Sequence, residues 1–183
     1  MSGIKIRGTG RFAPAKIVTN DDLAKVVDTS DEWITTRTRH HCTTETHTDM
    51  CVGAARQALE NAGISPEDIG ACVVATFSSD YLSPSAACMV QRGLGLPHDA
   101  VCFDLNAACS GFLFAIHTME CLLAQAPRKY GLVIGAEMLS RFINWEDRGT
   151  CVLFGDGAGA VVVEWREDYP SIHAVLGCHG DPD

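Results

Sequence analysis

Residues 71–77, ACVVATF, form a continuous apolar run in which apolar and polar side chains do not alternate. A strand with this pattern needs cover on both faces, as in a parallel or mixed sheet that lies between helices. The run therefore predicts an α/β domain in which at least one strand is shielded from water on both sides.

The rest of the chain fits this class, because short apolar runs alternate with amphipathic segments and no repeat or linker interrupts them. We expect strands at residues 4–6, 71–77, 100–105, 130–136, 151–165 and 172–177. We expect helices at residues 21–27 with Asn20 as N-cap, 31–37 with Ser30 as N-cap, 48–61, 85–94 and 111–126. A chain of 183 residues with this pattern is expected to form one domain.

Two glycine-rich stretches predict turns. The segment GTG at residues 8–10 is expected to end the first strand. The segment GDGAGA at residues 155–160 precedes the β-branched run VVVEW, whereas a dinucleotide-binding loop must lead into a helix. We therefore expect a tight turn between antiparallel strands there, and no phosphate site.

Composition excludes several function classes. The net charge of −9 and the scattered Lys and Arg residues argue against binding to nucleic acid or to an anionic membrane surface. No segment approaches the roughly 18 apolar residues of a membrane span, and the N-terminus lacks a signal-peptide core. The expectation is a soluble, cytoplasmic protein.

The nine cysteines are odd in number and contain no CxxC pair. This argues against a disulfide framework and against a zinc ribbon, so we expect no metal. Most of them lie in apolar segments, where a free thiol packs as a small hydrophobic group.

Cys109 differs from the others because it precedes a helix, residues 111–126, that is apolar around most of its circumference. Such a helix is expected to be enclosed by other structure. The free N–H groups and the positive dipole end at its start favour a thiolate and an oxyanion. Ser110 and Gly111 leave room beside the sulfur for a thioester. Cys109 is therefore a candidate nucleophile, and plain packing of a cysteine at a helix start is the alternative.

The sequence shows no histidine that could act as a catalytic base for Cys109. His117 lies eight residues along the same helix, about 12 Å away at the helical rise. The others are expected to be solvated surface residues: His40, His41, His47, His98, His173 and His179. The sequence thus contains no recognisable catalytic triad.

Five motifs in order resemble the N-terminal half of β-ketoacyl-acyl-carrier-protein synthase III. They are VDTSDEWITTRT (27–38), PSAAC (84–88), DLNAACSGFLFAI (104–116), DRGT (147–150) and LFGDGAGAVVVE (153–164). The resemblance covers nearly the whole chain. It implies that residues 1–183 are one βαβαβαββ half of a thiolase-like fold, with a mixed five-stranded sheet between helices.

The resemblance also implies an activity. Members of this family act as homodimers and start type II fatty-acid synthesis. An acyl group passes from acyl-CoA to a cysteine and is then condensed with malonyl-acyl-carrier protein, with loss of carbon dioxide. Acyl-CoA is thus implied as a substrate, and no permanently bound cofactor is implied.

The matching positions imply roles for individual residues. Cys109 is the implied acyl acceptor. The implied CoA-binding residues are Thr29, Trp33, Arg37 and Arg148, and the implied acyl-pocket residues are Leu139 and Phe154. Without the resemblance, Trp33, Leu139 and Phe154 would read equally well as core residues, and Arg37 as a solvated helix-end cation.

The sequence departs from the family in three places. The His and Asn that promote decarboxylation belong to the second half, and this chain ends about where the halves join, so we expect it not to complete condensation alone. A segment resembling GIxx is missing between Thr38 and Arg39, next to the CoA site. Ser83 stands where the family often has a large apolar side chain that reaches the partner's acyl pocket.

Three alternatives remain open at this point. One is a thiolase-like acyltransferase or condensing enzyme of secondary metabolism. Another is a non-catalytic module that only folds and dimerises through the strand near DLNAAC. A redox cysteine protein is disfavoured, because no second cysteine close to Cys109 in the sequence could resolve a disulfide.

Overall fold

The computed structural model describes residues 2–30, 32, 39–41 and 44–180. Its main feature is a five-stranded sheet with the order β1-β7-β6-β4-β5. The strands are β1 (Gly3–Phe12), β4 (Ile69–Ala75), β5 (Val101–Leu105), β6 (Tyr130–Met138) and β7 (Asp156–Arg166). β1, β7 and β6 pair antiparallel, whereas β6, β4 and β5 pair parallel, so the sheet is mixed.

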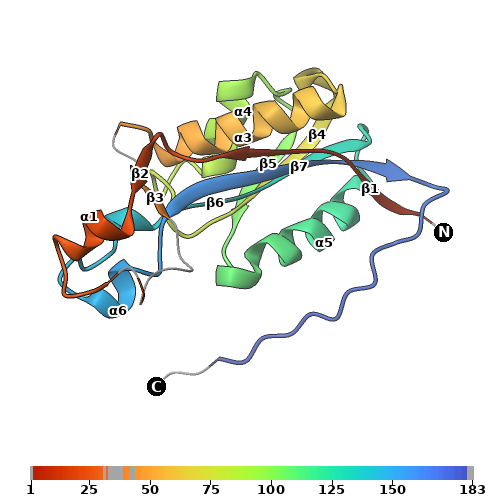
Figure 1. Ribbon diagram of the computed structural model, residues 1–183. Helices are drawn as coiled ribbons and strands as arrows, with labels where there is room; N and C mark the ends of the chain where they lie inside the picture. The colour runs from red at the N-terminus through yellow and green to blue at the C-terminus, as the bar shows by residue number, and fades with distance from the viewer. Residues whose placement is uncertain (1, 31, 33–38, 42–43, 181–183) are drawn as a thin grey trace.

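Three helices connect the strands of this sheet: α3 (His47–Ala62), α4 (Ala86–Leu94) and α5 (Gly111–Leu123). With the strands they give the order βαβαβαββ, which confirms the expected thiolase-like half. α3 and α4 cover one face of the sheet and α5 lies on the other (Figure 1).

β4 shows why the apolar run at its position was informative. All seven of its residues are buried. Cys72 and Val74 face the core under α3 and α4, whereas Ala71 and Val73 face the core under α5. The expected cover on both faces is confirmed.

α3 lies within one residue of its expected bounds, because its ends carry strong local signals. Thr46 and Asp49 form a reciprocal capping box at its start. Gly63 ends it with a φ of 65°, in the left-handed region that favours glycine. Ser85 likewise caps α4 by accepting a hydrogen bond from the N–H of Cys88.

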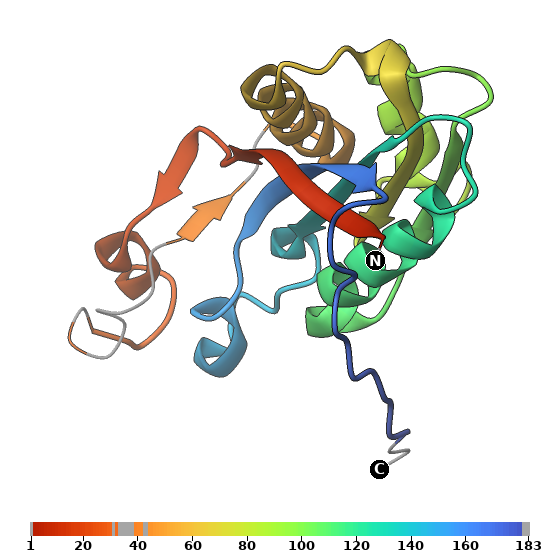
Figure 2. The same cartoon turned by 90° about the vertical axis from the view of Figure 1, so that its right-hand side faces the viewer.

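A smaller lobe lies beside one end of the sheet (Figure 2). It contains β2 (Lys16–Val18), α1 (Asn20–Ala24), β3 (Arg39–His41) and α6 (Arg148–Cys151). Asn20 was the expected cap of α1, but the cap is Thr19, whose hydroxyl accepts from the N–H of Asp22. The expected helix at residues 31–37 falls outside the described residues, apart from residue 32.

Both glycine-based turn predictions were wrong. β1 continues through residues 8–10 to Phe12. A Cβ at Gly8 or Gly10 would collide with the backbone of α3 near Ala58 or Ala54, so these glycines permit close helix packing. β7 likewise begins at Asp156 and includes Gly157 and Gly159 without a turn.

Two further expectations need correction. Residues 172–177 form no strand; the N–H of Ile172 instead donates a hydrogen bond to the buried carboxylate of Glu120 in α5. α5 is not enclosed on all sides, since Leu113 is 66% exposed and Cys121 is also exposed.

Within the described ranges, no helix has the length and apolar character of a membrane span. The same residues contain no group of three His, Cys, Asp or Glu side chains placed to hold a metal ion.

Candidate functional site

Cys109 lies in a short turn between β5 and α5. This turn is the 3-10 element η2 (Ala108–Ser110). Ala108 has a φ of 45°, which a side chain with a Cβ rarely adopts. The strained conformation is fixed by two hydrogen bonds, from the N–H of Ala108 to Oδ1 of Asn106 and from the N–H of Ser110 to the carbonyl of Ala107. Backbone strain of this kind concentrates at functional sites, and here it leaves the cysteine exposed.

The glycine after this turn lets α5 start directly against the sheet. A Cβ at Gly111 would stand only 3.3 Å from the Cβ of Ala75, the last residue of β4. The first N–H groups of a helix have no partner within the helix and attract negative charge. Cys109 therefore stands next to a 13-residue helix whose N-terminus meets the end of β4.

A cavity of about 410 Å³ opens beside Cys109. Its walls come from the end of β4, the end of β6, η2 and the start of β7. They are Ala75, Ala108, Cys109, Phe112, Gly135, Ala136, Glu137, Gly155, Asp156 and Gly157. It lies at the carboxyl ends of the parallel strands β4 and β6, where α/β proteins commonly bind ligands.

Asp156 is the buried carboxylate of this cavity. Its two oxygens accept hydrogen bonds from the N–H and the hydroxyl of Ser140, at 2.9 and 2.6 Å. The wall between β6 and β7 is therefore fixed by polar contacts as well as by the strand pairing.

The structure describes eight cysteines, and their settings differ. Cys51, Cys72 and Cys151 are buried, as expected for packing residues. Burial raises the pKa of Cys72, and it raises the pKa of the half-buried Cys102 to about 11. Cys121 and Cys178 were also expected to be buried, but both are exposed.

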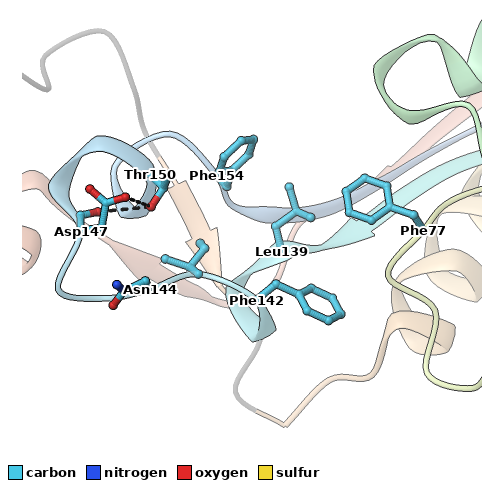
Figure 3. A pocket seen from close by; sticks show the side chains of 8 residues that line it. Phe77, Leu139, Phe142, Asn144, Asp147, Thr150 and Phe154 are labelled. Atoms are coloured by element: carbon cyan, nitrogen blue, oxygen red, sulfur yellow. Dashed lines mark hydrogen bonds between the residues drawn. The ribbon is translucent and has the colours of Figure 1, made fainter. Parts of the chain in front are cut away.

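A second cavity, of about 420 Å³, lies next to the first and is mostly apolar (Figure 3). Leu139 and Phe154 line it together, so the structure brings these two candidate residues to one place. Phe77, Phe142 and Ile143 complete its apolar wall, and Asn144, Asp147 and Thr150 form its polar end. The walls of the two cavities come from the same segments of the chain, since Phe154 is followed by Gly155 and Glu137 is two residues before Leu139.

Two of the candidate CoA-binding positions also come together. Arg148, an exposed residue at the start of α6, donates from Nη1 to the carbonyl of Asp28 at 3.2 Å. Asp28 precedes Thr29, whose Oγ1 is buried and has no hydrogen-bond partner in the described part of the chain. Trp33 and Arg37 lie outside the described residues.

The start of α6 is held by Asp147. Its carboxylate accepts hydrogen bonds from the N–H of Gly149 and the hydroxyl of Thr150. These bonds lower the pKa of Asp147. The cap fixes the first turn of α6, where the exposed Arg148 directly follows Asp147, a residue of the polar end of the second cavity.

His47 is not the solvated residue that the sequence suggested. It is fully buried in the first turn of α3, and its Nε2 lies 2.9 Å from Oγ1 of Thr76 and 3.1 Å from the carbonyl of Ala136. Because a carbonyl only accepts, Nε2 carries the hydrogen. One signal was available in the sequence, since position 47 falls on the apolar stripe of α3 that contains Met50, Cys51 and Ala54.

Comparison with known proteins gives the family. Residues 103–180 match the family model described as 3-Oxoacyl-[acyl-carrier-protein (ACP)] synthase III. The Beta-ketoacyl-[acyl-carrier-protein] synthase III of Clostridium acetobutylicum is 48% identical over 184 residues, which cover 98% of this chain and 56% of that protein. The chain belongs to the β-ketoacyl-acyl-carrier-protein synthase III family.

Solved structures agree with membership of the synthase III family. The crystal structure of 3-oxoacyl-[acyl-carrier-protein] synthase III from Aquifex aeolicus superposes with a TM-score of 0.85 at 49% identity, covering 91% of this chain and 55% of that one. The priming β-ketosynthase of the R1128 polyketide biosynthetic pathway has the same TM-score at 34% identity, covering 92% and 51%. The chain thus spans about half the length of the synthase III relatives it matches.

Proposed function

We propose that this chain is the acyl-accepting, N-terminal domain of a β-ketoacyl-acyl-carrier-protein synthase III, with Cys109 as the nucleophile. The observation that carries the proposal is the position of Cys109: exposed, in a strained turn, at the start of α5 and in the wall of a cavity. Family membership supplies the reaction class for that geometry.

In the proposed half-reaction, the sulfur of Cys109 attacks the thioester carbonyl carbon of acyl-CoA. A new carbon–sulfur bond forms while Cys109 loses its thiol proton, the bond to the CoA sulfur breaks, and the CoA thiolate leaves and takes up a proton, so that one proton is released and one is consumed. The negative charge that develops on the carbonyl oxygen is favoured by N–H groups at the start of a helix. The neighbouring apolar cavity, with Leu139 and Phe154, would receive the acyl chain.

The CoA end is proposed to lie over the smaller lobe. Arg148 offers an exposed guanidinium beside the segment that carries Thr29, and guanidinium groups can stack on flat rings and pair with phosphate. Trp33 and Arg37 are proposed to complete this site on the strength of the family motif alone.

The second half-reaction is proposed to need more than these residues. Condensation with malonyl-acyl-carrier protein uses a His and an Asn that the resemblance assigns to the other half of the fold. Acyl-CoA and malonyl-acyl-carrier protein are thus the proposed partners, and a homodimer is the proposed assembly.

The test is the intact mass of the protein before and after incubation with acetyl-CoA, followed by peptide mapping. We expect a gain of one acetyl group, located on Cys109, and no gain in Cys109→Ala. Cys121→Ala is the matched control, because Cys121 is also exposed but lies on the outer side of α5. An unmodified wild-type protein, or an adduct that persists in Cys109→Ala, would overturn the proposal.

The likeness to the R1128 priming β-ketosynthase supports a second candidate, a priming enzyme of secondary metabolism. The identity of 48–49% with synthase III relatives, against 34% with that ketosynthase, favours the first candidate. Because condensation needs the His and Asn of the other half, the deciding measurement is binding and not turnover. Tighter binding of a malonylated carrier protein of fatty-acid synthesis would favour the first candidate, and tighter binding of one from a polyketide pathway would favour the second.

A further inference from the structure

One carboxylate holds the loop that follows β4. Oε1 of Glu137 accepts the backbone N–H of Phe77 at 3.2 Å. Its Oε2 accepts from the hydroxyl of Thr76 at 3.3 Å and from the hydroxyl of Ser78. Three successive residues of the loop thus point their donors at a single side chain of β6.

The hydroxyl oxygens of Ser78 and Thr76 already accept hydrogen bonds from other groups. Oγ of Ser78 also accepts the N–H of Met138 at 2.8 Å, and Oγ1 of Thr76 accepts the N–H of Ser78 at 3.1 Å and the Nε2 hydrogen of His47. Both hydroxyl hydrogens are therefore left to point at Glu137. A side chain that only accepts is required at this position, and a carboxylate meets that need.

The far end of the loop is anchored independently. The carboxylate of Asp80 accepts from the backbone N–H groups of His47 and Thr48, from the Thr48 hydroxyl and from Nη2 of Arg141. Phe77, whose N–H is held by the first anchor, is 50% exposed. Its position therefore depends on the hydrogen bonds of its backbone more than on packing in the core.

Glu137 also links the walls of the two cavities. It lines the cavity of Cys109, while the residue it holds, Phe77, lines the apolar cavity. Figure 3 shows the ring of Phe77 directed toward Leu139, at the end opposite Asp147 and Thr150. A shift of the Phe77 backbone would thus change the apolar wall of the second cavity.

We propose that Glu137 is a positioning residue that fixes Phe77 as a wall of the acyl site and so limits the length of the acyl chain that Cys109 accepts. The inference rests on the proposed function in one respect, since it takes the apolar cavity as the acyl site. With the anchor removed, Phe77 can move outward and longer chains gain access.

The test compares single-turnover acylation of Cys109 by acetyl-CoA and octanoyl-CoA, followed by intact mass. In Glu137→Ala, we expect the octanoyl-to-acetyl rate ratio to rise about tenfold, within the range that methylene-sized differences in pocket fit produce. Phe77→Ala should give a similar rise, and the double variant should add little to either, because both changes act on one wall.

Glu137→Gln tests whether the anchor needs a side chain that only accepts. Its amide oxygen can still accept the N–H of Phe77, but its NH2 group then faces the donor hydroxyls of Thr76 and Ser78, so the ratio should rise, by less than in Glu137→Ala. A ratio that stays at the wild-type value in Glu137→Ala, or that rises additively in the double variant, would overturn the inference. Equal loss of both rates would indicate a structural role only and would also overturn it.

A second readout separates this inference from the proposed function. Iodoacetamide and N-octyl iodoacetamide alkylate a free thiol without CoA or turnover, so their rate ratio at Cys109 reports the same wall. If no acyl-CoA reacts but the alkylation ratio rises in Glu137→Ala, the proposed function fails and the positioning role stands. If acyl-CoA reacts and neither ratio changes in that variant, the positioning role fails alone.

Discussion

At the scale of single residues, His47 is the clearest case of a side chain whose role depends on distant partners. It donates toward Thr76 and the Ala136 carbonyl, which lie 29 and 89 residues away in the sequence. Cys109, by contrast, could be predicted as a site residue from its neighbours in the sequence, because the apolar helix that follows it is recognisable there. The strained turn at Ala108 and the hydrogen bonds of Glu137 could not be predicted, since backbone angles and long-range hydrogen bonds leave no local sequence pattern.

The burial of His47 leads to a stability prediction. His47→Leu would leave the Ala136 carbonyl without this donor in a buried site, which we expect to lower the free energy of unfolding by about 2 kcal/mol. Urea unfolding should show a lower midpoint with an unchanged slope. His98→Leu is the matched control, because His98 is exposed, and it should change stability by less than about 0.5 kcal/mol. Equal losses in the two variants would contradict the assigned role of His47.

At the scale of helices and strands, the sequence predicted an element correctly where the signal lies within the segment itself. The ends of α3 carry a capping box and a terminal glycine, and its predicted bounds were right within one residue. The apolar run of β4 predicted its burial. The glycines of β1 led to a wrong turn prediction because they allow α3 to pack closely on the strand. The residues of α3 that they contact, Ala54 and Ala58, lie more than 40 positions away in the sequence.

Glu164 links three neighbouring elements through charge. It lies in β7, its side chain is 5% exposed, and it pairs with Arg7 of β1 and with Lys129 just before β6, each at 2.6 Å. Burial alone would raise the pKa of Glu164, but the hydrogen bonds from Lys129 and Arg7 outweigh burial and hold the pKa below its usual value. A carboxylate with a lowered pKa stabilises the fold above its unfolded pKa of about 4.3, and this contribution is lost as pH falls through the folded-state pKa.

Glu164→Gln should therefore lower the free energy of unfolding by about 1 kcal/mol at pH 7, a modest loss because Lys129 is half exposed. The difference from the wild type should shrink below about pH 4 and vanish once the wild-type carboxylate is also protonated. Urea unfolding at a series of pH values measures this. Asp168→Asn is the control, because Asp168 is exposed and pairs with Arg166, two residues before it on the chain. A difference that stays constant down to acid pH would show that packing, and not charge, explains the loss.

At the scale of the whole molecule, the two cavities lie at one end of the sheet, whereas the outer side of α5 and the edge strand β5 lie elsewhere. Both cavities open where β4 and β6 end and β7 begins. The outer side of α5 exposes Leu113, and β5 forms one edge of the sheet. The sequence predicted the apolar character of α5 and β5. It could not show that they lie at a surface of this chain, because that depends on the order of strands in the sheet.

The free edge of β5 leads to the last prediction. In the described part of the chain β5 pairs only with β4, and its sequence VCFDL contains no Lys or Pro to block a further strand. We expect a second copy to pair along this edge, so that sedimentation equilibrium shows a homodimer. Val101→Lys should weaken the dimer by about tenfold or more, because Val101 is 48% exposed at the start of β5 and two such lysines would place like charges in the interface. Val175→Lys, at an 89% exposed position in the C-terminal segment, is the matched control and should dimerise like the wild type. A Val101→Lys protein that dimerises as tightly as the wild type would show that the two copies meet through a different surface.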